Sequence, residues 1–166
     1  MINYSANTAI SFDLSALPGS VNGLAGREST QVDNTTTRYD GALVNVKGII
    51  GHAATAPVIG QRMSLYVWGA DTSLATTGID TLDGTDSAET LTQGAILNAL
   101  RHVATTEVTV ATAALTYFFQ PFDIAAFFNG VMPKFWGLYA THNQAGALGA
   151  ANSALFSFNG ITYTTT

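Results

Sequence analysis

The sequence predicts an all-β fold, namely an antiparallel β-sandwich or jelly roll with one short helix, formed by residues 1–166 as a single domain. Three observations favour this fold. Apolar and polar residues alternate with a period of two in short runs. Gly, Asn, Asp and Pro separate these runs, as turn residues do. Nine Phe, six Tyr and two Trp, within 47% hydrophobic residues, provide the core of one domain of this length.

The clearest predicted strand covers residues 62–68. Met63, Leu65 and Val67 share one face, because successive side chains of a strand point to opposite sides. The opposite face holds Arg62, Ser64, Tyr66 and Trp68. Further strands are predicted over residues 10–14 and 101–110, and residues 39–50 form either a strand pair or one long bent strand.

The last third of the chain is the richest in aromatic residues. Residues 115–122 form a strand that is covered on both faces. Asp123 then caps a single helical turn that Asn129 and Gly130 close. Strands follow over residues 135–140 and 154–163, which gives about eight strands in all. Four aromatic side chains of this region are expected in the core: Phe119, Phe122, Trp136 and Phe156.

Four segments do not fit a regular strand pattern. Residues 71–92 carry seven Thr and two Gly and form a long excursion, which is uncommon unless it is functional or mobile. Residues 87–100 favour a short helix or an irregular turn, although a strand stays open. The polar stretches 1–8 and 29–38 are candidate flexible arms that become ordered on a partner.

Charged residues make up only 10% of the chain, against roughly 25% in an average soluble domain. Small and hydroxylated residues replace them, including 25 Ala and 23 Thr. The surface is therefore almost neutral and weakly self-repelling. This composition favours a protein that works assembled with copies of itself or with a partner.

The same composition excludes several function classes. The chain has only six Lys and Arg residues and a net charge of −5. It therefore lacks the basic surface that binds nucleic acid or an anionic membrane. The absence of Cys excludes disulfides, thiolate catalysis and Cys-based zinc sites. The first residues lack the basic and apolar regions of a signal peptide, so we expect synthesis in the cytoplasm.

Candidate catalytic or metal-binding groups are sparse. His52, His102 and His142 lie far apart in the sequence, in no metal-binding spacing. The acidic residues of the excursion recur every third position, at Asp80, Asp83, Asp86 and Glu89. They favour a solvated acidic loop over a cation site, because their spacing misses the calcium-loop pattern. No cofactor and no enzymatic activity are predicted.

Four aromatic residues on predicted strands are the candidate binding residues: Tyr66, Trp68, Trp136 and Tyr139. Exposed aromatic rings on a β-sandwich can stack on sugar rings. Aromatic residues on alternating strand positions are, however, more often part of a core or of a subunit contact. We therefore treat the four residues as an interface or core group first and as a sugar-stacking platform second.

The sequences FQPFDIAAFFNGVMPKFWGL (119–138), NQAGA (143–147) and FNGITY (158–163) resemble small β-sandwich structural proteins of tailed bacteriophage virions. The resemblance covers roughly the last 50 residues. It implies a strand, a one-turn helix, a turn that ends in proline and a second strand that closes the jelly roll. No binding residue of that family can be transferred, because its members hold their partners through broad surfaces that differ between phages.

The resemblance implies a capsid decoration or cement protein on the capsid exterior, made in the host cytoplasm. Its partners would be the lattice of the major capsid protein and its own copies, as a homotrimer or homodimer, with no nucleic acid and no membrane. The alternative is a receptor-binding or carbohydrate-binding module of a tail or fibre. Copy number distinguishes the two, because decoration needs hundreds of copies per particle and a fibre needs few.

Overall fold

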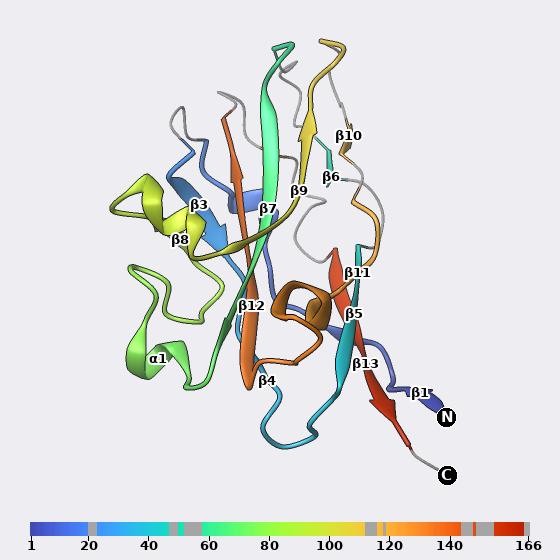
Figure 1. Cartoon of the computed structure of the whole chain (residues 1–166). Coiled ribbons are helices and arrows are strands. Elements are labelled where there is room, and N and C mark those ends of the chain that lie inside the picture. The colour runs from blue at the N-terminus through green and yellow to red at the C-terminus, as the bar shows by residue number, and fades with distance from the viewer. Residues whose placement is uncertain are drawn as a thin grey trace.

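The computed structural model describes residues 1–19, 23–46, 50–51, 58–111, 116–117, 119–143, 148 and 155–164. Two antiparallel sheets face each other and form a β-sandwich, which confirms the predicted fold class (Figure 1). Every paired strand in the described part runs antiparallel to its neighbour. The chain enters and leaves the sandwich at the same end, where both termini lie.

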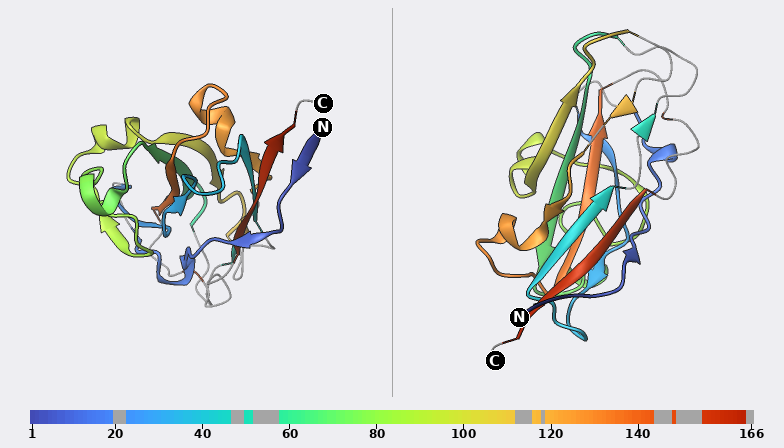
Figure 2. Two further views of the ribbon diagram at one scale, coloured as in Figure 1. Left: turned by 90° about the horizontal axis from the view of Figure 1, so that it is seen from below. Right: turned by 90° about the vertical axis from the view of Figure 1, so that its right-hand side faces the viewer.

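The first sheet contains the strands next to both termini and is called the terminal sheet. Its strands, in spatial order, are β1 (Ile2–Tyr4), β13 (Phe156–Tyr163), β5 (Gly41–Val46) and β11 (Phe122–Asp123). A further strand, β2 (Thr8–Ala9), also pairs with β13. The first strand, β1, therefore forms one outer edge of this sheet (Figure 2).

The second sheet is called the capped sheet, because the excursion lies against it. Its strands, in spatial order, are β8 (Ala88–Thr90), β3 (Ala25–Glu28), β12 (Phe135–His142), β7 (Arg62–Ala70) and β9 (Arg101–Glu107), and β4 (Val32–Asp33) also pairs with β12. A separate pair consists of β10 (Thr116–Tyr117) and β6 (Ile50–Gly51).

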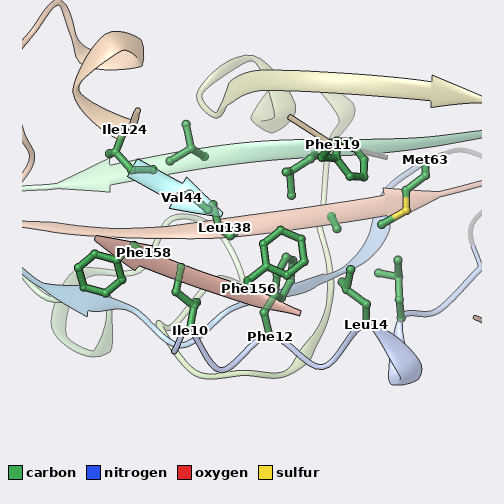
Figure 3. Close-up of a cluster of buried hydrophobic side chains, with 14 of the residues drawn as sticks. Ile10, Phe12, Leu14, Val44, Met63, Phe119, Ile124, Leu138, Phe156 and Phe158 are labelled. Atoms are coloured by element: carbon green, nitrogen blue, oxygen red, sulfur yellow. The ribbon is translucent and has the colours of Figure 1, made fainter. Parts of the chain in front are cut away.

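The main core fills the space between the two sheets (Figure 3). Met63, Leu65 and Val67 are completely buried in it, as the alternation in β7 predicts. The Trp136 ring lies edge-on to Phe158 across the core, with ring centres 5.3 Å apart. Each aromatic residue of this size that leaves water contributes several kcal/mol, so the core supplies most of the driving force for folding.

The predicted helical turn after residue 122 is confirmed. It is a 3₁₀ helix, η3 (Ile124–Phe128), and the Asp123 carboxylate accepts a hydrogen bond from the Ala125 N–H (3.2 Å). Asn129 closes the turn with a φ of 56°, the left-handed conformation that Asn tolerates better than most residues. The other helical segments are η1 (Leu14–Ala16), α1 (Leu74–Thr77) and η2 (Gly94–Asn98).

The polar N-terminal stretches are part of the sheets in this structure. Within residues 1–8, expected as a flexible arm, β1 and the start of β2 pair with β13. Within residues 29–38, β4 pairs with β12, and the Asn34 side chain bridges the following turn to Tyr39. Whether either stretch contacts a partner stays a prediction.

Three local predictions differ from the structure. Residues 10–14 form no strand, although Ile10, Phe12 and Leu14 are buried. The Ile10 N–H donates to the Phe156 carbonyl, the Ser11 carbonyl accepts from the Thr30 N–H, and the chain then turns into η1, so no ladder with one strand continues. Phe122 is only half-buried, because it lies on a two-residue strand at the end of the sheet. Residues 47–49, 115, 118 and 154 of the predicted strands lie outside the described residues.

The excursion at residues 71–92 folds against the outer face of the capped sheet. It contains α1 and β8, and it buries Leu74, Leu82 and Leu91 against the strands. These residues form a second apolar cluster with Trp68, Leu100 and Tyr139. The excursion and the terminal edge of β1 lie on opposite sides of the molecule (Figure 2).

Candidate functional site

A buried carboxyl group holds the excursion against the capped sheet. Glu28 lies on β3 opposite Tyr139 of β12 and is completely buried. Its Oε1 accepts hydrogen bonds from three successive backbone N–H groups, those of Asp83 (3.1 Å), Gly84 and Thr85 (2.8 Å). Its Oε2 has no hydrogen-bond partner among the described residues. One side chain of the sheet thus fixes the middle of the excursion.

The environment of Glu28 favours its neutral form. Burial raises the pKa of Glu28 from 4.5 to about 8, and the nearby charge of Asp83 adds to this rise. The three N–H groups act in the opposite direction, because they stabilise the carboxylate. Burial also raises the pKa of Tyr139, whose hydroxyl donates to the Leu24 carbonyl (2.8 Å). At neutral pH the contact is therefore mainly that of a protonated acid.

A partly buried ion pair holds the next part of the excursion. Arg27 Nε lies 2.6 Å from Asp86 Oδ1, and Arg27 Nη2 donates to the Asp86 carbonyl (2.9 Å). The same carboxylate accepts from the Ser11 hydroxyl (2.9 Å) and from the Asp13 N–H (3.1 Å). Asp86 therefore links the excursion both to β3 and to the N-terminal segment.

The four candidate aromatic residues do not gather on the surface. Trp68, Trp136 and Tyr139 have exposed fractions of 1%, 1% and 0%, so they belong to the cores of the chain itself. Tyr66 is half-buried, with its ring against that of His102. Among the described residues, the outer face of the capped sheet therefore presents no group of exposed aromatic rings on which a sugar could stack, because the excursion covers Trp68 and Tyr139.

The histidines and the acidic residues of the excursion do not form a common site. His142 is buried near the Leu17 carbonyl, His102 is exposed and bonded to Thr105, and His52 lies outside the described residues. The carboxylates of Asp80 and Glu89 accept from nearby hydroxyl or N–H groups of the excursion itself. In the described ranges, no three His, Asp or Glu side chains come close enough to hold a metal ion.

A cleft of about 740 Å³ lies beside the end of β13, with Tyr163 in its lining. Arg38 and Lys134 bring two cationic groups to its walls, and Tyr39, Met132 and Tyr163 bring apolar surface. Arg38 has a φ of 53°, a left-handed conformation that costs a non-glycine residue about 1 kcal/mol. Asp40 also lines the cleft and brings one carboxylate to it. The cleft therefore combines two cationic groups and one acidic group with an exposed aromatic ring.

In the described residues, most of the exposed large apolar side chains lie at two separate places, and a further one, Val131, lines the cleft. One group, called the terminal edge, consists of Met1, Ile2, Tyr4 and Tyr163, each 57–77% exposed. The other, called the distal tip, consists of Val58, Ile59 and Val110, each 57–63% exposed. The distal tip lies where β7 begins and β9 ends, because residues 60 and 61 bond to Val108. That end of the sandwich is opposite the termini (Figure 1).

Comparisons with known proteins give no assignment: no family model, no curated protein and no solved structure matches the chain. The likeness of residues 119–163 to virion proteins therefore stays a prediction. No helix in the described part has the length and apolar character needed to cross a membrane.

The sequence patterns do not reveal the two polar anchors of the excursion, Glu28 and the Arg27–Asp86 pair. The segment AGRES around Glu28 has too few apolar residues to indicate a strand. Both anchors join residues 55 or more positions apart, so no local pattern could reveal them. The only local signal is Gly26, where a Cβ atom would lie 2.4 Å from the Ala140 carbonyl oxygen and would prevent the close pairing of β3 and β12.

Proposed function

We propose that the protein is a structural component of a bacteriophage virion that decorates the capsid exterior as a cement protein. It binds both the lattice of the major capsid protein and other copies of itself. Such a role needs no catalytic site. It needs surfaces that hold two kinds of partner at once.

The observation that supports this proposal is the presence of two separate exposed apolar surfaces at opposite ends of one sandwich, the terminal edge and the distal tip. Soluble monomers place charged residues between such side chains. Here only 10% of the chain is charged. One surface suits contact between copies and the other suits contact with the shell, since interface cores are depleted of charge and rich in apolar and aromatic residues.

A lattice converts such modest contacts into strong binding. A protein that binds only the assembled shell stabilises it by RT ln(1 + [L]/Kd) for each site. Association of the copies with one another adds avidity without new contacts to the shell. Small apolar surfaces are therefore sufficient for a cement protein present in many copies.

Copy number tests the proposal directly. Quantitative mass spectrometry of purified virions that contain the protein should find it in hundreds of copies per particle. A double variant of the distal tip, Val58→Lys with Ile59→Lys, should lower this number, whereas Thr76→Lys on the exposed side of α1 should not. A few copies per particle would contradict the proposal.

The cleft favours a second candidate function, the binding of an acidic sugar by a tail or fibre module. Arg38 and Lys134 could hold a carboxylate while Tyr163 lies against the sugar ring. Titration with glucuronate, followed by NMR, should then shift signals of the cleft, and Arg38→Ala should abolish the shifts while Arg101→Ala leaves them. Equal shifts with glucose, or none with glucuronate, would contradict this candidate.

A further inference from the structure

The open side of β1 has a defined hydrogen-bonding pattern. On the side of β13, the Thr164 N–H donates to the Met1 carbonyl (3.0 Å) and the Ser5 N–H donates to the Gly160 carbonyl (2.8 Å). Backbone groups of successive residues in an antiparallel pair alternate between the partner strand and the opposite side. Met1, Asn3 and Ser5 therefore face β13, and the N–H and C=O groups of Ile2 and Tyr4 face away from it.

No strand in the described part of the chain pairs with that outward side. Ile2 and Tyr4 are 57% and 62% exposed, so their side chains are open to solvent as well. Two N–H and two C=O groups are thus left without strand partners beside two exposed apolar side chains. A strand edge of this kind is a template for another strand.

The edge also lacks the features that normally prevent strand addition. Natural edge strands carry Lys or other charged residues, Pro or a bulge. Residues 1–12 contain no charged side chain and no Pro, and β1 pairs with β13 without a register shift. The short length of β1 is the one protective feature, and it limits the contact to a few hydrogen bonds.

We propose that β1 pairs with β1 of a second copy, in an antiparallel register that places Asn3 opposite Asn3 of the partner. In this register Ile2 and the partner's Tyr4 exchange both backbone hydrogen bonds, and Tyr4 does the same with the partner's Ile2. The two terminal sheets then form one continuous sheet across a two-fold axis. This contact is isologous, so it closes as a dimer.

The second copy is the partner that this edge fits best. The outward groups of Ile2 and Tyr4 are symmetric about Asn3, so the strand is complementary to itself. On one face, the Ile2 side chain meets the partner's Tyr4, an aromatic and β-branched pair of the kind that stabilises antiparallel strands. Tyr163, aligned with Ile2 on β13, extends this apolar surface. No like charges meet when two identical edges approach.

The inference rests on the homo-oligomeric part of the proposed function and assigns its surface and register. It does not depend on the contact with the capsid. Cross-linking therefore tests the edge, whereas copy number in virions tests the capsid role, and the two can fail separately.

A single-cysteine cross-link provides the test, because the chain contains no Cys. In the proposed register Asn3 and the partner's Asn3 form a non-hydrogen-bonded pair, with Cα atoms about 4.5 Å apart, which is within the range that a disulfide spans. Mild oxidation should convert most of Asn3→Cys to a covalent dimer. The control Thr76→Cys, exposed on α1, should stay mainly uncrosslinked. Equal cross-linking of the two variants would overturn the inference.

A second variant keeps the test independent of cysteine chemistry. Ile2→Lys places two like charges at the paired edge, so we expect the dimer Kd to rise at least about tenfold. Light scattering measures the dimer, and circular dichroism checks that the variant is folded. Thr76→Lys serves as the control. A native monomer at micromolar concentration, or a dimer that Ile2→Lys leaves unchanged, would overturn the inference; the second result would leave self-association itself in place.

Discussion

The outer faces of the two sheets differ in what covers them. On the capped sheet, Trp68, Tyr139 and Glu28 point outward and are buried under residues 71–92. On the terminal sheet, Tyr163 lies on the face opposite that of Phe156 and Phe158 and is 60% exposed. Both sheets carry large residues on the outward face of their strands. The excursion covers this face of the capped sheet, whereas Tyr163 on the terminal sheet stays exposed.

The comparison shows that burial of an outward strand face is decided by distant segments. Leu82 of the excursion and Trp68 of β7 come together in one cluster although no regular pattern connects them. The hydrogen bonds of Glu28 and the ion pair of Asp86 hold the excursion against the capped sheet. In the described part, no comparable segment lies over Ile2, Tyr4 and Tyr163, which are 57–62% exposed, although Ile161 on the same sheet is buried.

The largest expected effect concerns the apolar contact between the excursion and the capped sheet. Trp68→Ala removes a side chain that is 99% buried between the capped sheet and the excursion, so it should lower the free energy of unfolding by about 3–5 kcal/mol. Urea unfolding measures the change. Tyr4→Ala is the matched aromatic substitution on the terminal sheet. Similar costs for both variants would show that the two faces do not differ as described.

The next effect concerns how the contact between Glu28 and the excursion makes the stability of the fold depend on pH. Unfolded Glu28 loses its proton near pH 4.5, whereas folded Glu28 keeps it until about pH 8. Between these values the unfolded state binds fewer protons, so the free energy of unfolding should fall as the pH rises. The pKa difference corresponds to a total decrease of about 3–5 kcal/mol in the free energy of unfolding, and this decrease is complete above pH 8.

Glu28→Gln isolates this effect, because Gln imitates the protonated acid and does not titrate. Thermal or urea unfolding between pH 5 and pH 8 should show a flatter dependence for Glu28→Gln than for the native protein. Parallel curves for the two proteins would contradict the burial of a neutral Glu28. Amide exchange at residues 83–85 should rise with pH more steeply in the native protein than base catalysis alone explains.

A smaller effect concerns the ion pair between Arg27 of β3 and Asp86 of the excursion. Asp86→Ala leaves Arg27, whose side chain is 12% exposed, without its carboxylate and should cost about 2–3 kcal/mol. Glu107→Ala breaks the exposed pair with Arg62 and should cost at most about 1 kcal/mol. Urea unfolding of both variants measures the difference. A cost for Glu107→Ala equal to that for Asp86→Ala would show that burial does not control these pairs.

The smallest effect on the isolated chain is expected at the open edge. Ile2→Ala should change the free energy of unfolding of the monomer by no more than about 0.5 kcal/mol, because the side chain is 57% exposed. The same substitution should weaken self-association. Dilute samples, studied below the dimer Kd, separate the two quantities. A large loss of monomer stability would place Ile2 in a core that the structure does not show.

Sequence analysis predicted the elements that depend on local patterns. The period of two placed Met63, Leu65 and Val67 on the core face of β7, and Asp123 with Asn129 marked both ends of η3. These features are fixed by strand geometry and by capping, which act within a few residues. The all-β class followed from the number of such runs.

The candidate site could not be predicted in the same way. Tyr66 and Trp68 are two residues apart on one strand face. Only Trp68 is fully buried, because the excursion covers Trp68 more completely than Tyr66. Glu28 lies in a polar stretch for which local patterns predicted no element. The outward direction of the Ile2 and Tyr4 backbone groups depends on the register with β13, which no single strand contains.

Amide hydrogen exchange at Tyr4, measured by NMR over a range of protein concentrations, tests most directly whether the open edge pairs with a second copy. The Ser5 N–H, which donates to Gly160 within the chain, is the internal reference. The account predicts that Tyr4 exchanges at nearly the unprotected rate in dilute samples and becomes protected as concentration rises, relative to Ser5. A Tyr4 rate that stays fast at every concentration while the protein is dimeric, or that is already slow in the monomer, would contradict it.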